Sequence, residues 1–142
     1  MLLITSNSAA TFGLAWLAAT CALALHVADE AAHDFLAWYN PRALRIREFL
    51  GGLPFPPTFT FWPWLGALST AVVALGALTP LAYAGTSWMR PAAFGLGVVH
   101  VANGLLHLVG AVVARRAVPG VWSAPLLLVA GAWLVRVAAQ LS

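Results

Sequence analysis

The sequence predicts an all-α fold: an integral membrane bundle of four transmembrane helices, with a short interfacial helix between helices 1 and 2. Of the 142 residues, 62% are hydrophobic and only 8% are charged, whereas a soluble domain carries about 25% charged residues. Four apolar segments have the length of about 20 residues that a helix needs to cross a bilayer. Proline, glycine and arginine gather between these segments, so we expect one transmembrane helical domain over residues 1–142.

The four predicted spans are separated by short connections. They cover residues 9–27, with a helical extension to residue 37, then residues 61–84, 90–115 and 121–141. Pro41 is expected to stop the extension of the first helix, because proline disrupts a helix interior. Residues 51–57 (Gly-Gly-Leu-Pro-Phe-Pro-Pro) predict a rigid turn before the second span. Pro119-Gly120 predicts a tight hairpin between the third and fourth.

The basic residues are placed as in a membrane protein. All seven are arginines, and they form no stripe of the kind that binds nucleic acid, so no nucleic-acid partner is expected. In residues 41–50 three arginines alternate with apolar side chains, which indicates an interfacial helix, although a basic loop is an alternative. The first and third connections carry five arginines: Arg42, Arg45, Arg47, Arg115 and Arg116. Because positive loops stay in the cytoplasm, both termini are predicted outside.

A polar face interrupts the end of the first span. His26, Glu30 and His33 follow one another at i, i+4 and i+7, which places them on one face of a helix. Asp29 lies beside them, and Asp34 is expected at the headgroups. His26 is 17 residues beyond residue 9, or about 25 Å from the outer boundary at 1.5 Å per residue.

The third span carries a second polar face at a matching depth. His100, Asn103 and His107 occupy positions i, i+3 and i+7, and His107 lies 17 residues after Arg90. In a four-span bundle the first and third helices run in the same direction, so the two faces meet. Three glycines on the third span would let another helix approach closely: Gly97, Gly104 and Gly110. Ionisable groups inside a membrane are costly and indicate function by default.

Several motifs of the sequence occur together in the order of a known family. They are His26-Val-Ala-Asp29-Glu30, an aromatic stretch with Phe35 and Trp38, Asn103-Gly-Leu-Leu-His107, Ala114-Arg115-Arg116 and Pro119-Gly120. The sequence resembles the bacterial HXXEE-domain membrane proteins, named for a His-x-x-Glu-Glu motif. Here an aspartate, Asp29, replaces the first glutamate of that motif. The resemblance implies a multi-pass protein of the bacterial inner (cytoplasmic) membrane, but it supplies no reaction.

The resemblance and the two polar faces together predict one catalytic site. Its members are His26, Asp29, Glu30, Asn103 and His107. A carboxyl group in apolar surroundings tends to hold its proton and can act as an acid, while a second group in a more polar place takes a proton. This pairing suits isomerisation, cyclisation or epoxide opening of a lipid- or terpenoid-like substrate, with no cofactor. We expect five further side chains to contact that substrate: Trp16, His33, Trp38, His100 and Trp133.

Other functions remain open at this point. Glu30-Ala-Ala-His33 has the Glu-x-x-His spacing of helical di-iron proteins, but the third span adds no carboxylate. The alternative is therefore a single divalent transition metal held by histidine and carboxylate ligands. A small transport protein, or an assembly protein whose polar residues join helices, are further alternatives, and a homo-oligomer is compatible with each. The expected partners are the lipid bilayer and a hydrophobic small molecule.

Overall fold

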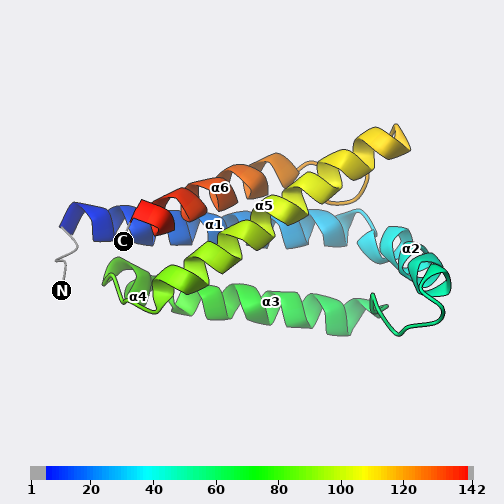
Figure 1. Ribbon diagram of the computed structural model, residues 1–142, viewed down its shortest axis with the longest axis horizontal. Helices are drawn as coiled ribbons and strands as arrows, with labels where there is room; N and C mark the ends of the chain where they lie inside the picture. The colour runs from blue at the N-terminus through cyan, green and yellow to red at the C-terminus, as the bar shows by residue number, and fades with distance from the viewer. Residues whose placement is uncertain (1–5, 141–142) are drawn as a thin grey trace.

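The computed structural model describes residues 6–140, and the regular structure in this part of the chain consists of helices joined by loops (Figure 1). Its helices are α1 (Ser6–Ala32), α2 (Phe35–Phe49), α3 (Phe61–Ala77), α4 (Thr79–Tyr83), α5 (Met89–Ala114) and α6 (Ala124–Gln140). Three segments are long and apolar enough to cross a membrane: Asn7–Ala32, Phe61–Tyr83 and Met89–Ala114. α6 is also apolar, but with 17 residues it is shorter than these three segments. The prediction of an all-helical, multi-pass membrane protein is confirmed at this level.

α1 is the central helix of the bundle. It packs against α3, α4, α5 and α6, and Figure 1 shows α5 crossing it at an angle while α6 runs beside it. The start of α1 and the end of α6 lie at the same end of the molecule, and α2 lies at the opposite end (Figure 1). The core between α1, α4 and α6 is formed by large apolar side chains such as Phe12, Trp16 and Leu134.

The predicted boundary between the first span and the interfacial segment was wrong. α1 ends at Ala32 and does not reach residue 37, because Asp34 adopts a left-handed conformation (φ 57°) that breaks the helix. Aspartate tolerates this region better than most residues. Pro41 does not stop a helix either, since it lies inside α2, on its exposed side. The helix that was predicted to be interfacial, α2, is therefore longer than expected and contains the aromatic residues before Pro41.

α2 is held in place by the loop that follows it. Asn40 donates to the carbonyl of Phe59 (2.9 Å) and accepts from the backbone N–H of Phe59 (3.1 Å). The Nε of Arg47 donates to the carbonyl of Pro56 (2.7 Å). The proline-rich turn thus folds back over α2 and fixes one side of the cavity described below.

The remaining predicted spans match the structure closely. The second is interrupted at Leu78, just before Pro80, and the third coincides with α5 within one residue. The predicted fourth span covers α6, and its predicted end at residue 141 lies outside the described residues.

Two glycines of α5 face α6, as predicted from their small size. A Cβ on Gly97 would lie 2.7 Å from the carbonyl oxygen of Gly131, and a Cβ on Gly104 would lie 2.9 Å from that of Ala124. The two backbones therefore approach more closely than larger residues would allow. Gly110, the third predicted contact glycine, lies on another side of α5 at ordinary distance from Trp38.

Candidate functional site

Three ionisable side chains from α1 and α5 meet near one end of the bundle. The Nε2 of His107 lies 3.1 Å from Oε1 of Glu30, and the Nε2 of His26 lies 3.5 Å from the same oxygen. The imidazole rings of His26 and His107 pack edge to face with centroids 4.7 Å apart. All three residues are buried, with at most 5% of their surface exposed. The two faces predicted from helical spacing therefore do meet.

The hydrogen bonds of His107 define where its protons lie. Nδ1 is 2.7 Å from the carbonyl oxygen of Pro119, and a carbonyl can only accept, so Nδ1 carries a proton. The other nitrogen, Nε2, then faces the carboxyl group of Glu30. A hydrogen bond across that 3.1 Å gap needs one more proton, held either by Glu30 or by His107. The pair therefore shares a single proton that can move between oxygen and nitrogen.

His26 has the same tautomer but a different set of partners. The amide nitrogen of Asn103 lies 3.1 Å from Nε2 and can only donate, so Nε2 accepts and Nδ1 carries the proton. Nδ1 in turn donates to the hydroxyl of Ser123, 2.8 Å away. Asn103 and Ser123 thus fix the ring of His26 from both edges.

Asp29 lies beside the cluster of three and is linked to it through Ser123. Its Oδ2 accepts from the hydroxyl (2.7 Å) and the backbone N–H (2.9 Å) of Ser123, and its Oδ1 lies 2.8 Å from Nδ1 of His33. Ser123 immediately precedes α6, at the end of a helix where the first backbone N–H groups have no hydrogen-bond partner within the helix. Asp29 therefore joins α1 to the start of α6 and orients Ser123, which orients His26.

Ser123 is a site residue that the sequence reasoning missed. The sequence signal available for it is modest: a serine after Pro119-Gly120 and just before an apolar helix fits a helix N-terminus. Nothing in the spacing connects residue 123 with residue 26, since the contact depends on how α6 returns along α1. The carboxylate–serine–histidine chain is therefore visible in the structure alone.

The backbone of the turn between α5 and α6 lies close to the rings of both histidines. Gly120 has a φ of +83°, and a Cβ there would lie 2.7 Å from Cε1 of His107 and 3.0 Å from Cε1 of His26. Only glycine combines this backbone conformation with so close an approach. The Pro119-Gly120 turn, predicted as a simple hairpin, is thus one wall of the site.

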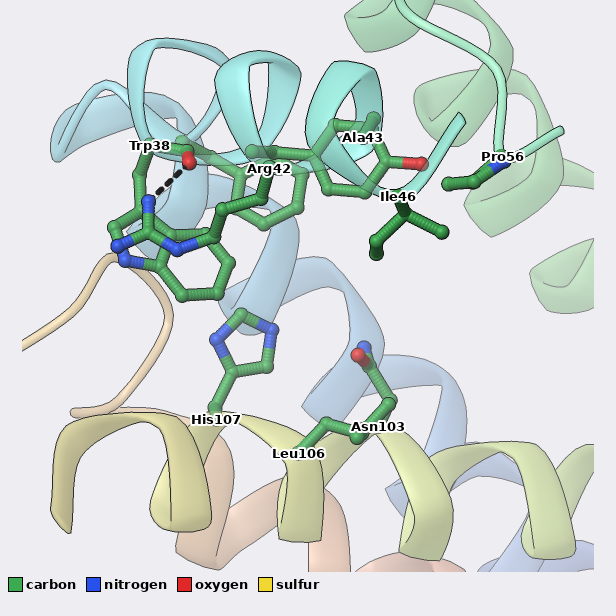
Figure 2. Close-up of a pocket in the computed structure, with 10 residues that line it drawn as sticks. Trp38, Arg42, Ala43, Ile46, Pro56, Asn103, Leu106 and His107 are labelled. Carbon is green, nitrogen blue, oxygen red and sulfur yellow. Dashed lines mark hydrogen bonds between the residues drawn. The ribbon is translucent and has the colours of Figure 1, made fainter. Parts of the chain in front are cut away.

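An apolar cavity of about 300 Å³ opens beside the cluster, between α2 and α5. Figure 2 shows His107 and Asn103 pointing from α5 toward the side chains of α2. α2 contributes the aromatic rings of Phe35, Trp38 and Tyr39, and Trp38 stacks with the ring of His107 at 6.4 Å between centroids. The outer rim includes Leu106 and Ile46, which are 69% and 47% exposed. A hydrophobic molecule could enter past this rim and reach His107.

The predicted substrate-contacting residues divide into two groups. Trp38 lines the apolar cavity, and His33 lines a more polar cavity next to it. Trp16 is buried in the core, where its Nε1 donates to the carbonyl of Leu75 (2.9 Å), and Trp133 packs on that core. His100 is buried and bonds the carbonyl of Ala19 (3.2 Å), which joins α5 to α1. The last three residues line neither cavity.

Comparisons of the chain with protein-family models, with curated proteins and with solved structures found no match. Membership of the HXXEE family therefore stays a prediction, as do the functions considered from the sequence. What the residues themselves provide is a buried histidine–glutamate–histidine cluster beside an apolar cavity.

Proposed function

We propose that the chain is an intramembrane enzyme that performs acid–base chemistry on a hydrophobic, lipid- or terpenoid-like substrate. The observation that carries this proposal is the 3.1 Å contact between Nε2 of His107 and Oε1 of Glu30, next to an aromatic, apolar cavity. Four helices cross the membrane in this proposal, α6 included, and the arginine-rich connections face the cytoplasm. The resemblance to bacterial HXXEE-domain proteins is compatible with that arrangement.

The reaction that fits this pair is the movement of a proton between carbon atoms. Glu30 with His107 delivers its shared proton to an unsaturated carbon and leaves a carbocation, which the faces of Trp38 and Phe35 stabilise. The pair, now short of one proton, removes a proton from a neighbouring carbon and returns to its starting state. The substrate keeps its atomic composition, so isomerisation and cyclisation both balance. Delivery of the proton to an epoxide oxygen would break one C–O bond and leave a carbocation beside the new hydroxyl group. Removal of a proton from a neighbouring carbon by the same pair would then give an allylic alcohol and restore the acid.

Deuterium labelling tests this proposal. Purified protein in lipid nanodiscs is incubated in D2O with a panel of unsaturated and epoxidised terpenoids and fatty acids, and the products are analysed by mass spectrometry. We expect at least one compound to be converted to an isomer that carries carbon-bound deuterium, or to an opened epoxide. A panel from which the protein generates neither product would contradict acid–base chemistry on this class of substrate.

A second candidate function is a mononuclear metal site at the same three residues, because their geometry is also suitable for ligands. The facing atoms of His26, Glu30 and His107 all lie within 4.8 Å of one another. Bonds of about 2.0–2.1 Å from a tetrahedral zinc ion to nitrogen or oxygen place neighbouring ligand atoms about 3.3 Å apart. Oε1 of Glu30 lies 3.1 Å from Nε2 of His107 and 3.5 Å from Nε2 of His26, and these two distances lie on either side of that value. Both histidines also donate their second ring N–H to oxygen, as metal-bound histidines do.

Elemental analysis separates the two candidates. If the site holds a metal, protein purified without chelator is expected to contain about one equivalent of a divalent transition metal, and His107→Ala is expected to lose it. His33→Ala is the matched control, because His33 lies outside the cluster and its variant should keep the metal. Metal below a tenth of an equivalent in wild-type protein, with full turnover in EDTA, would exclude the metal function and leave the acid–base one.

A further inference from the structure

We propose that the cavity between α2 and α5 binds a single-chain anionic amphiphile, whose carboxylate or phosphate headgroup is held by the guanidinium of Arg42. This inference names the substrate class of the proposed enzyme and in that respect rests on the proposed function. The binding it predicts can be measured without any turnover.

Arg42 is placed as a headgroup ligand at the boundary between two cavities. It lines both the apolar cavity and a polar cavity of about 330 Å³, and Trp38 also lines both. Its guanidinium lies 4.2 Å from the centre of the Trp38 ring, and its Nη1 donates to the carbonyl of Trp38. Figure 2 shows this side chain lying along Trp38 above His107. The stacking orients the guanidinium without using most of its five N–H donors.

Among residues 6–140, no carboxylate forms an ion pair with Arg42. Across residues 6–140 every ion pair involves a histidine, and no arginine pairs with a carboxylate. The polar cavity contains a second guanidinium, Arg116, against one carboxylate, Asp34, while its histidine, His33, is engaged by Asp29. Two fixed positive charges thus face one negative charge. An anion is the ligand that complements this imbalance, and arginine matches carboxylate and phosphate geometry well.

The size of the apolar cavity indicates what the hydrophobic part of the ligand is. Ligand pockets typically measure about 300–1,000 Å³, and this one is at the lower limit, so it holds a segment of one hydrocarbon chain and not two acyl chains. The exposed Leu106 and Ile46 at the rim let the rest of the chain extend into the bilayer. A ligand with its headgroup on Arg42 would therefore lay its first carbon atoms over His107 and Asn103.

The test compares charged and neutral ligands of equal chain length. Binding of radiolabelled oleate to purified protein is measured by scintillation proximity, with oleoyl lysophosphatidate, oleyl alcohol and inorganic phosphate as competitors. We expect oleate and oleoyl lysophosphatidate to compete at similar concentrations and oleyl alcohol to be about tenfold weaker, since a charge-assisted hydrogen bond typically contributes that factor. Inorganic phosphate at millimolar concentration is expected not to compete, because it lacks the apolar chain.

Two arginine variants distinguish a built site from the general charge of α2. Arg42→Gln is expected to weaken oleate binding about tenfold and to leave oleyl alcohol unchanged. Arg45→Gln, three residues along the same helix, removes an equal charge from a side chain that lines neither cavity, and it should bind oleate as the wild type does. Both proteins are first shown to elute as the wild type does in size-exclusion chromatography.

Three results would overturn the inference. They are equal affinities for oleate and oleyl alcohol, equal losses in Arg42→Gln and Arg45→Gln, or full competition by inorganic phosphate. Glu30→Gln separates this inference from the proposed function, since it is expected to bind oleate normally while lacking acid–base activity. Arg42-dependent binding by a protein that converts no substrate would support the binding site and reject the enzyme.

Discussion

Replacing Glu30 with glutamine is expected to reduce turnover by at least about a hundredfold, because acid–base groups contribute about 10²–10⁴ in rate. Glutamine has almost the same shape and can still donate a hydrogen bond to Nε2 of His107. It cannot pass a proton to that nitrogen or receive one from it. The variant should therefore keep the packing of α1 against α5 while losing the shared proton of the wild-type pair.

The measurement for Glu30→Gln is conversion of the substrate found by deuterium labelling, at equal amounts of folded protein. Glu48→Gln is the matched control, since Glu48 is exposed on α2 and outside both cavities, and its variant should retain wild-type turnover. Metal content is measured in both proteins, because Glu30 is also a ligand of the alternative metal site. Wild-type turnover in Glu30→Gln would refute the assignment of Glu30 as the acid.

Much of the fold follows from hydropathy and spacing alone. Apolar runs bounded by arginine, proline and glycine locate α1, α3 with α4, α5 and α6 to within a few residues. The pairing of His26 with His107 was also predictable, because equal distances from the starts of two parallel helices place side chains at equal depth. Both predictions use the regular geometry of a single helix, together with the requirement that each span cross the whole membrane.

What could not be predicted depends on contacts between distant segments. The break after α1 is set by the left-handed conformation of Asp34, which composition does not reveal, whereas Pro41 was the more obvious signal and proved wrong. Tertiary packing of α2 against the proline-rich loop lets that helix continue through a proline. Ser123 was missed for a similar reason, because its partners lie 94 and 97 residues away in the sequence.

The predicted site residues also divide according to this distinction. His26, Glu30, Asn103 and His107 are brought together by helical geometry, which the sequence encodes locally. Trp16, Trp133 and His100 were predicted to contact the substrate, yet Trp16 and His100 join helices within the core and Trp133 packs on that core. Periodicity shows that a side chain faces a neighbouring helix, but it does not distinguish a helix contact from the wall of a cavity.

Gly120→Ala is expected to damage the site although Gly120 has no chemistry of its own. A left-handed alanine costs about 1–2 kcal/mol of folding free energy, and overpacking a filled site costs about 1–3 kcal/mol more. The added methyl group would lie 2.7 Å from His107 and 3.0 Å from His26, so both rings must leave the positions in which they contact Glu30 and Ser123. We expect a clear drop in the melting temperature in detergent together with loss of turnover.

Gly51→Ala separates the two causes of that damage. Gly51 also has a positive φ (+73°), but a Cβ there meets no atom within 4 Å. The Gly51 variant therefore carries the backbone strain alone, and it should retain turnover with a smaller loss of stability. The difference between the two variants in melting temperature and turnover therefore measures the effect of the close contact between the Pro119-Gly120 turn and the two histidines. Equal stability and equal turnover in both would mean that the turn does not hold His26 and His107 in place, and that their orientation comes from Asn103, Ser123 and the carbonyl of Pro119.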